Sequence, residues 1–320
     1  MIRRQRTLKA LARCGSFGVK VVTMRLSACL LILCCGVAVA QRPPQATTTS
    51  GARTISIISE PATTIWIDEI KRGVTDDKGA LRSLKLSNGA HTLRARAMGF
   101  KEISIPIPAA QRESLVLRLF RTNDQAELLF QKAETARGTA RDDAGRQSSA
   151  DLYRQAIKLR PAFPAAHVGL ARVLLDMNDS NNALAEIDAA RGERAIYPEA
   201  SAVEGRIYRE TGQTDEAIGA FNRAIREAHG FQPEAHVGIG RVYEDKGEYE
   251  LAVREFRIAI NQLADTEPII YQLLGAAYEK SGNNASAIAA YENYLRLAPN
   301  GSLAPAVRSI VEQLRSQPPD

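Results

Sequence analysis

Residues 41–320 of this 320-residue chain contain no cysteine, and this absence excludes several kinds of chemistry. All four cysteines lie within the first 40 residues, as Cys14, Cys29, Cys34 and Cys35. The rest of the chain therefore forms no disulfide, no thiolate zinc site and no cysteine nucleophile. Its stability must come from packing alone.

Motifs of several enzyme classes are also absent. The sequence has no G-x-S-x-G elbow, no Gly-rich phosphate loop followed by Lys-Ser/Thr and no H-E-x-x-H pair. Carboxylate pairs such as Asp142-Asp143 lie in connections, where solvent exposure is expected. We therefore predict a protein that is not an enzyme, with no catalytic residue, no metal site and no cofactor.

The net charge of +6 and the pI near 9.2 are concentrated at one end of the chain. Residues 1–40 contain seven basic side chains and no acidic one, which leaves 35 basic against 36 acidic residues over 41–320. Without the first 40 residues the net charge is −1. The composition therefore predicts no nucleic-acid partner.

No hydrophobic run in the first 40 residues is long enough for a membrane span. The run Leu26–Ala40 is apolar and uncharged, but its 15 residues extend only about 22 Å as a helix, against about 30 Å of hydrocarbon. It follows Arg25 and ends in Ala38-Val39-Ala40, a typical cleavage signature. We predict an export signal over 1–40, cleaved near Ala40.

Export predicts a location in the periplasm or cell envelope. A membrane anchor is less favoured because the run is short, and a lipid anchor is less favoured because the lipobox-like Leu26-Ser27-Ala28-Cys29 has its apolar core after the cysteine instead of before it. Translation starts at Met1 or at Met24. Residues 41–53 contain Pro43-Pro44 and a Thr/Ser/Gly run, so we predict a flexible linker.

From residue 54 to residue 121 apolar and polar residues alternate, which is typical of strands with one buried face. The apolar positions form six runs: Ile55 and Ile57; Ile65 and Ile67; Leu84 and Leu86; Leu93, Ala95 and Ala97; Ile103, Ile105 and Ile107; Leu115, Leu117 and Leu119. Asn88-Gly89 between two of them predicts a hairpin. Six short strands predict a small antiparallel β-sandwich. Trp66 is out of phase with its neighbours, so it is either a contact residue or a cover for the second face of the sheet.

Several motifs in this region carry a family resemblance. They are Pro61–Asp68, Gly73-Val74-Thr75, the Leu/Gly/His pattern over 84–93 and Gly99-Phe100. Together they resemble the PEGA domain, which implies a modular β domain of bacterial or archaeal surface and envelope proteins. The tetrapeptide that names the family is here Pro-Ala-Thr-Thr, without its glycine.

After residue 122 the period becomes helical, and one pattern recurs every 34 or 35 residues. Its first position holds a small residue: Ala171, Gly205, Gly240 and Gly275. Four further positions recur at fixed distances after the small residue. Three residues later stand Leu174, Tyr208, Tyr243 and Tyr278, and 12 residues later stand Ala183, Ala217, Ala252 and Ala287. Sixteen residues later stand Ile187, Phe221, Phe256 and Tyr291, and 19 residues later stand Ala190, Ala224, Ala259 and Tyr294. The pattern resembles the tetratricopeptide repeat (TPR), which implies pairs of helices A and B stacked into a superhelical solenoid.

A degenerate repeat precedes these four, with helices expected over about 124–137 and 148–159 and a lengthened connection over 138–147. Residues 304–316 predict a capping helix that presents a polar outer face to solvent. The fold class is thus α+β as separate domains. The PEGA-like β-sandwich occupies 54–121, the all-α TPR solenoid of about five repeats plus cap occupies 122–316, and a tail follows at 317–320.

The four histidines give no metal site. His167 and His236 occupy the same position of helix A, one whole repeat apart. With helices packed about 8–10 Å apart and a B helix between successive A helices, one ion cannot bridge them. We interpret both as residues that pack the repeats.

The TPR resemblance implies a concave groove lined by the A helices, the usual peptide-binding surface of that family. The candidate partner-binding residues are Arg172, Arg206, Arg209, Arg241, Glu244, Gln272 and Glu279. Arg172, Arg206 and Arg241 recur in register, and we call them the arginine ladder. Guanidinium groups suit carboxylates, so the ladder is expected either to bind a partner or to pair with Glu199, Glu234 and Glu244 within the stack.

We therefore predict an exported, non-enzymatic scaffold for protein–protein interaction in the bacterial cell envelope. Its partner is a protein that places an acidic or C-terminal segment in the groove. The alternative is a module that binds envelope polysaccharide or peptidoglycan through the PEGA-like domain. The sequence makes no prediction of the oligomeric state.

Overall fold

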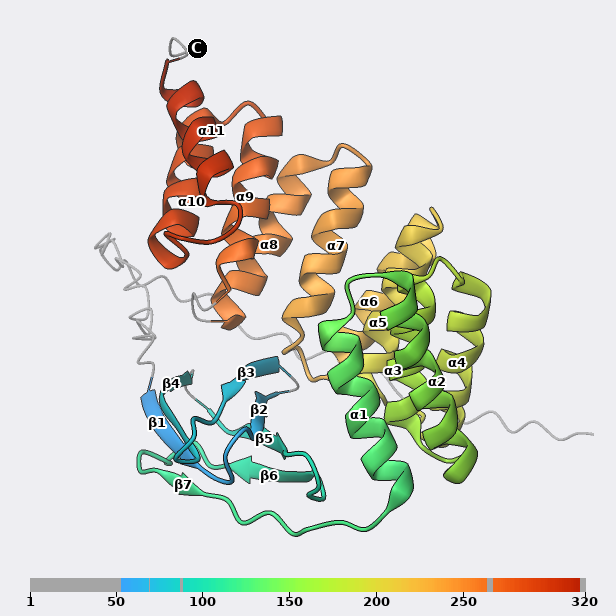
Figure 1. Cartoon of the computed structure of the whole chain (residues 1–320). Coiled ribbons are helices and arrows are strands. Elements are labelled where there is room, and N and C mark those ends of the chain that lie inside the picture. Colours follow the sequence, from blue (N-terminus) through green and yellow to red (C-terminus); the bar gives the residue numbers. More distant parts are fainter. Residues whose placement is uncertain (1–52, 69, 87–88, 264–266, 317–320) are drawn as a thin grey trace, which may run out of the picture. The chain divides into compact units, whose positions relative to one another are not determined.

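The computed structural model describes residues 53–68, 70–86, 89–263 and 267–316. All of these residues belong to one compact unit of the chain. The predicted export signal, the four cysteines, the linker up to residue 52 and the tail lie outside the described residues. Figure 1 shows the strands in blue to teal and the helices in green to red.

The β-rich part, which we call the β module, has seven strands among the described residues. They are β1 (Arg53–Ile58), β2 (Thr64–Ile67), β3 (Ile70–Val74), β4 (Ala80–Leu86), β5 (His91–Arg96), β6 (Ile103–Ile107) and β7 (Leu115–Val116). Strands β4, β1 and β7 form one sheet in that order, and β3, β2, β5 and β6 form the other. The alternating apolar residues are buried in one cluster that both sheets share, and Ile57, Ile65 and Leu93 are fully buried there.

Two details of the predicted sandwich are wrong. The strands on either side of Asn88-Gly89 do not form a hairpin, because β4 pairs with β1 whereas β5 pairs with β2 and β6. The chain passes from one sheet to the other there, which lets both apolar faces bury against each other. The sixth predicted strand is only the two-residue β7, and it pairs with β1 in parallel.

The helical part has eleven helices among the described residues. They are α1 (Gln125–Thr139), α2 (Asp143–Leu159), α3 (Pro164–Asp176), α4 (Ser180–Glu193), α5 (Pro198–Glu210), α6 (Thr214–Glu227), α7 (Pro233–Asp245), α8 (Tyr249–Leu263), α9 (Pro268–Lys280), α10 (Asn284–Leu297) and α11 (Ala304–Ser316). Four A helices, α3, α5, α7 and α9, start with proline. Proline suits the first helical position because its φ is already helical and the missing N–H has no partner there.

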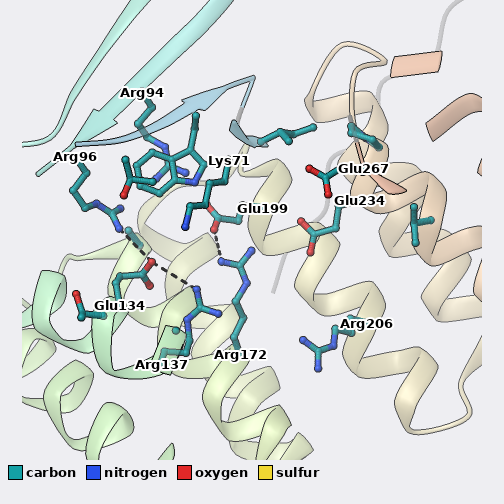
Figure 2. Close-up of a pocket in the computed structure, with 18 of the residues that line it drawn as sticks. Lys71, Arg94, Arg96, Glu134, Arg137, Arg172, Glu199, Arg206, Glu234 and Glu267 are labelled. Atoms are coloured by element: carbon teal, nitrogen blue, oxygen red, sulfur yellow. Dashed lines mark hydrogen bonds and ion pairs between the residues drawn. The ribbon is translucent and has the colours of Figure 1, made fainter. Parts of the chain in front are cut away.

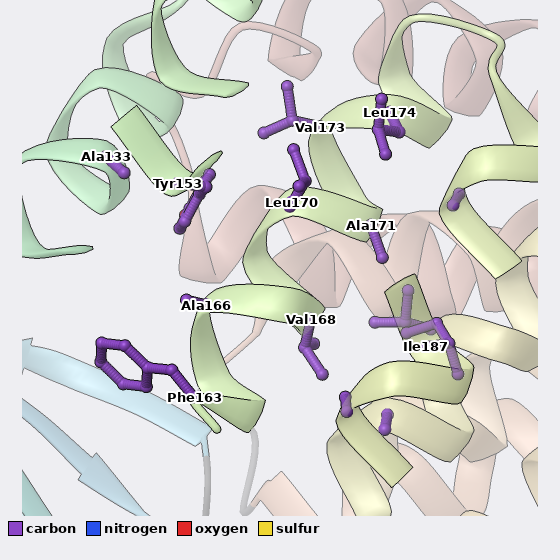
Figure 3. Close-up of a cluster of buried hydrophobic side chains, with 14 of the residues drawn as sticks. Ala133, Tyr153, Phe163, Ala166, Val168, Leu170, Ala171, Val173, Leu174 and Ile187 are labelled. Atoms are coloured by element: carbon purple, nitrogen blue, oxygen red, sulfur yellow. The ribbon is translucent and has the colours of Figure 1, made fainter. Parts of the chain in front are cut away.

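In three of the repeats, the glycine at the small-residue position lies against an aromatic ring of the following B helix. A Cβ added to Gly205 would lie 2.7 Å from the Phe221 ring, and one added to Gly240 would lie 2.5 Å from Phe256. These rings fill the space between the two helices of a repeat. Figure 3 shows the corresponding buried cluster around α3, with Tyr153 on one side and Ile187 on the other.

The degenerate first repeat is present as α1 and α2, but its connection is shorter than expected. Helix α2 starts at Asp143, so only residues 140–142 join it to α1. The Asp142 carboxylate caps the helix by accepting a hydrogen bond from Gly145 N at 2.8 Å. The Asp142-Asp143 pair, expected in a connection, thus lies at the start of a helix, where acidic side chains are favoured. Helix α11 begins and ends where the cap was predicted.

Candidate functional site

The β module and α1 are joined through one buried amide side chain. Gln131 is 2% exposed, and its Oε1 accepts a hydrogen bond from Gly99 N at 2.9 Å. Its Nε2 donates to Phe100 O at 2.7 Å. A buried amide with both ends bonded fixes the direction of the groups it joins. The turn at residues 98–100 is therefore held against the first TPR-like helix pair.

Charged groups reinforce this junction. Arg96 of β5 is 8% exposed and lies 2.6 Å from Glu102 and 3.2 Å from Glu134 of α1. Its guanidinium also lies over the rings of Trp66, at 5.1 Å, and Phe130, at 4.5 Å. Burial raises the pKa of Glu134, but the charges of Arg137 and Arg96 outweigh it and leave that pKa below its ordinary value. The carboxylate is therefore ionised at neutral pH.

A cavity of about 1080 Å³ lies beside this junction, and we call it the cleft. Strands β2, β3 and β5 line one side, and helices α1, α3, α5, α7 and α9 line the other. Figure 2 shows Arg94 and Arg96 entering from the strands, and Arg172, Arg206 and Glu234 entering from the helices. The inner wall of the helical stack thus faces the β module of the same chain, which narrows the surface that the sequence predicted to be open.

Arg172 and Glu199 form the central ion pair of the cleft, at 2.5 Å (Figure 2). The two side chains are 18% and 19% exposed. Although burial raises the pKa of Glu199, the charges of Arg172 and Arg94 lower it to about 2. The pair joins α3 to α5. Arg172, the first member of the arginine ladder, is therefore already paired within the helical stack.

The other arginines of the predicted site differ in their partners. Arg206 lies 2.7 Å from Asp176 and 2.8 Å from Glu210. Arg209 lies 2.8 Å from Asp245 and does not line the cleft. Arg241 lines the cleft and forms no ion pair with any residue that the structure describes. It is therefore the member of the ladder that remains available to a ligand.

The remaining three predicted site residues lie outside the cleft. Burial raises the pKa of Glu244 despite the neighbouring charges of Lys280 and Arg241. Glu279 accepts a hydrogen bond from the Tyr291 hydroxyl at 2.8 Å. Gln272 is half-buried on α9. The structure thus brings Arg172, Arg206 and Arg241 to one cavity and leaves Arg209, Glu244, Gln272 and Glu279 away from it.

Family models of the tetratricopeptide repeat match residues 202–268 and residues 269–300. The helical part of the chain is a TPR solenoid. A comparison with curated proteins yields no match.

Solved structures with similar folds include a thermophilic TPR protein of Thermus thermophilus. That structure has 22% sequence identity and a TM-score of 0.51, over 60% of this chain and all of that one. PilF of Pseudomonas aeruginosa has 13% identity and a TM-score of 0.50, over 60% of this chain and 89% of that one. PilW, described as a widely conserved type IV pilus biogenesis factor, has 14% identity and a TM-score of 0.50, over 61% and 93% of the two chains. At these identities the likeness shows the fold.

The two equivalent histidines of the TPR stack make equivalent contacts. His167 Nδ1 lies 2.6 Å from Glu186, and His236 Nδ1 lies 2.7 Å from Glu255, 19 residues further on in both cases. Each pair joins an A helix to the B helix that follows it. Within the described part of the chain, no cluster of three or more His, Cys, Asp or Glu side chains is placed to hold a metal ion.

Sequence reasoning missed the contribution of the β module to the cleft. Trp66 is half-buried and lines the cavity, with the Arg94 guanidinium 4.5 Å from its ring centre. Lys71 of β3 also lines it. A signal was present, because Trp66, Arg94 and Arg96 occupy the strand positions between the buried residues, which places an aromatic ring and two cations on one outer face.

None of the helices in the described ranges combines the length and the apolar composition that a membrane span requires.

Proposed function

We propose that this protein is a non-enzymatic scaffold that holds a segment of a partner protein in the cleft between its TPR helices and its β module. The observation that carries the proposal is the mixed lining of the cleft. Val237, Ile269 and Leu273 supply apolar surface, and Ile269 is 43% exposed. Apolar pockets with a few charged groups are typical of binding sites.

The uncommitted charges favour a partner with an acidic group. Arg241 of α7 and Lys71 of β3 line the cleft and form no ion pair within the described ranges. Arg241 lies one helical turn after Val237, so a cation and an apolar side chain share one face of α7. An acidic or C-terminal segment with an adjacent apolar side chain suits this combination.

Site-specific photo-crosslinking tests the proposal in cells. A photoreactive residue at Ile269, inside the cleft, is expected to capture a defined partner. The same residue at Ile196, which is 68% exposed and lies outside the cleft, is the matched control. Capture at Ile269 that is lost with Arg241→Glu supports the proposal. Equal capture at both positions, or capture that Arg241→Glu leaves unchanged, contradicts it.

A second candidate function rests on Trp66. An aromatic ring beside arginines can also contact a sugar, so the alternative is an envelope polysaccharide or peptidoglycan bound through the PEGA-like β module. Trp66→Ala would then abolish sedimentation with purified peptidoglycan, whereas Arg241→Glu would leave it unchanged. Loss of peptide-segment capture without loss of glycan binding separates the two functions.

We further propose that the protein acts after export, in the periplasm or cell envelope. The support is the apolar run Leu26–Ala40 and its small-residue end, together with the absence of cysteine after residue 40. Sequencing the N-terminus of the protein purified from the cell envelope tests this. A start at Gln41 is expected, and a start at Met1 or Met24 contradicts cleavage.

We also propose domain limits from the sequence patterns. The segments are 1–40, 41–53, 54–121, 122–316 and 317–320. Limited proteolysis tests them, because a flexible linker is cut before folded parts. Early cleavage within 41–53 is expected. Early cleavage inside α3–α10 contradicts this division.

A further inference from the structure

A second cavity, of about 390 Å³, lies at the edge strands β3 and β4 of the β module, and it shares Lys71 and Glu267 with the cleft. Five cationic side chains line it, and its lining has one carboxylate, that of Glu267. The cations are Lys71 and Arg72 of β3, Arg82 and Lys85 of β4, and Arg296 of α10. We call this cavity the basic pocket. Its formal charge of +4 contrasts with residues 41–320, whose net charge is −1.

Most of these cations form no ion pair within the described ranges, although the charge of Arg82 helps to lower the pKa of Asp76. Lys71, Arg82 and Lys85 form no ion pair with any residue in the described ranges, and Arg296 bonds to the neutral amide of Asn293. Burial lowers the pKa of Arg72, while the charges of Glu267 and Asp68 raise it. Like charges gathered in one cavity repel each other and destabilise the fold. An anion in the pocket would remove this repulsion.

The pairing of β1 with β4 is irregular beside the pocket, and this irregularity affects the direction of the β4 side chains. Ile55 and Ile57 of β1 pair with Leu84 and Leu81 of β4, so Arg82 and Ser83 together oppose one residue of β1. This is a β-bulge, a feature that redirects side chains and is frequent beside binding sites. Ser83 has φ of 57°, in the left-handed region that non-glycine residues rarely adopt. Backbone strain of this kind concentrates at functional sites.

A hydrogen bond holds the two edge strands together at this point. Arg72 Nη2 donates to Lys85 O at 2.9 Å, and it thereby joins β3 of one sheet to β4 of the other. The cations from the two strands are therefore brought to one cavity by a defined contact. Leu81, Leu297 and Ser83 also line the pocket.

We propose that the basic pocket binds the phosphate group of a phosphate ester. Guanidinium and ammonium groups are the side chains that bind phosphate oxygens most strongly, and a hydroxyl adds a further donor. A volume of about 390 Å³ falls in the range of small-ligand sites, so it leaves room for the group that the ester carries. The carbon atoms of that group would contact Leu81 and Leu297.

The same chemistry occurs in an anionic phospholipid headgroup and in a soluble sugar or glycerol phosphate. Two probes distinguish these sources with the full chain at physiological ionic strength. The first is sedimentation with phosphatidylcholine vesicles that contain or lack phosphatidylglycerol. The second is calorimetric titration with glycerol 3-phosphate. Binding to either probe that depends on the pocket supports the proposal, and the probe that binds identifies the source.

The test variant is the double substitution Arg82→Gln and Lys85→Gln. Both side chains are exposed and neither lines the cleft, so the fold and the proposed partner site should be retained. We expect about tenfold weaker binding, since charged hydrogen bonds to the ligand are lost. A charge-conserving variant, Arg82→Lys with Lys85→Arg, is expected to retain most of the binding.

The matched control removes two positive charges elsewhere on the β module. Lys101 and Arg118 are exposed and line neither cavity, so Lys101→Gln with Arg118→Gln should bind as the unaltered chain does. Equal weakening by the control variant would show attraction by net charge alone and overturn the proposal. Unchanged binding by the test variant, or binding to neither probe, would overturn it as well.

Discussion

Arg172 in α3 and Glu199 in α5 are joined by a hydrogen bond of 2.5 Å that links two successive A helices of the TPR stack. Both side chains are about four-fifths shielded from solvent. Each of the two charges is stabilised by the other, which is held in place beside it. The Glu199 carboxylate also lies near Arg94 of the β module, and the charge of Arg94 lowers the pKa of Glu199. The pair is therefore a structural element of the cleft as well as part of its lining.

Removing one partner of this pair should destabilise the chain. Glu199→Gln keeps the size of the side chain but removes the carboxylate charge with which Arg172 is paired. We expect a loss of about 3 kcal/mol in the free energy of unfolding, measured by urea denaturation. Arg206→Gln is the control, because Arg206 is 42% exposed and its ion pairs should contribute less than about 1 kcal/mol. Equal losses in the two variants would contradict this assignment.

The lowered pKa of Glu199 predicts that the free energy of unfolding falls in acid. Glu199 has a pKa of about 2 in the folded chain, against the ordinary glutamate value of 4.5. A depressed pKa contributes stability that is present above 4.5 and is lost as the pH falls toward 2. The difference in unfolding free energy between the unaltered chain and Glu199→Gln should therefore narrow over that range. A difference that stays constant from neutral pH to pH 2 would show that ionisation of Glu199 does not contribute.

The raised pKa of His167 predicts a free energy of unfolding that decreases as the pH rises. The hydrogen bond to Glu186 raises its pKa above 6.5, although burial lowers it. A raised pKa contributes stability that is complete below 6.5 and is lost as the pH rises through the folded value. Glu186→Gln should reduce this loss, as measured by urea unfolding and by titration of the His167 ring in NMR spectra. A pH dependence that Glu186→Gln leaves unchanged would contradict this assignment.

The sequence predicted the helical part well because its signals are local and repeated. The small residue before each aromatic position indicates a close approach, and Gly205 does lie against Phe221. Strand alternation in the β module was equally informative, since it reports which face is buried. Pairing partners were not predictable in the same way. The Asn88-Gly89 dipeptide favours a tight turn. Whether the strands before and after it pair with each other depends on whether both belong to the same sheet, which the dipeptide does not determine.

The cleft was predicted in part. Repeat positions placed Arg172, Arg206 and Arg241 on the same face of successive A helices, and all three line one cavity. Their ion-pair partners depend on side-chain length and on neighbouring turns, so Arg206 pairs with Asp176 and Glu210 instead of with Glu234 or Glu244. The β module's contribution depends on how two parts of the chain contact, which repeat periodicity does not encode. Gln131 makes that contact, and nothing in its local sequence distinguishes it.

The glycine positions of the stack allow a sharp comparison between two equal substitutions. Gly240→Ala adds a methyl group that would lie 2.5 Å from the Phe256 ring, which is fully buried and cannot move without opening the core. Overpacking of this kind costs about 1 to 3 kcal/mol. Gly219→Ala, in the middle of α6, meets no atom within 4 Å. There the substitution should stabilise the chain by about 0.5 to 1 kcal/mol, because alanine restricts the unfolded backbone. Thermal unfolding of the two variants should therefore shift in opposite directions. A shift in the same direction would mean that the aromatic rings do not require the small residue, and close packing against those rings would then not explain the repeat pattern.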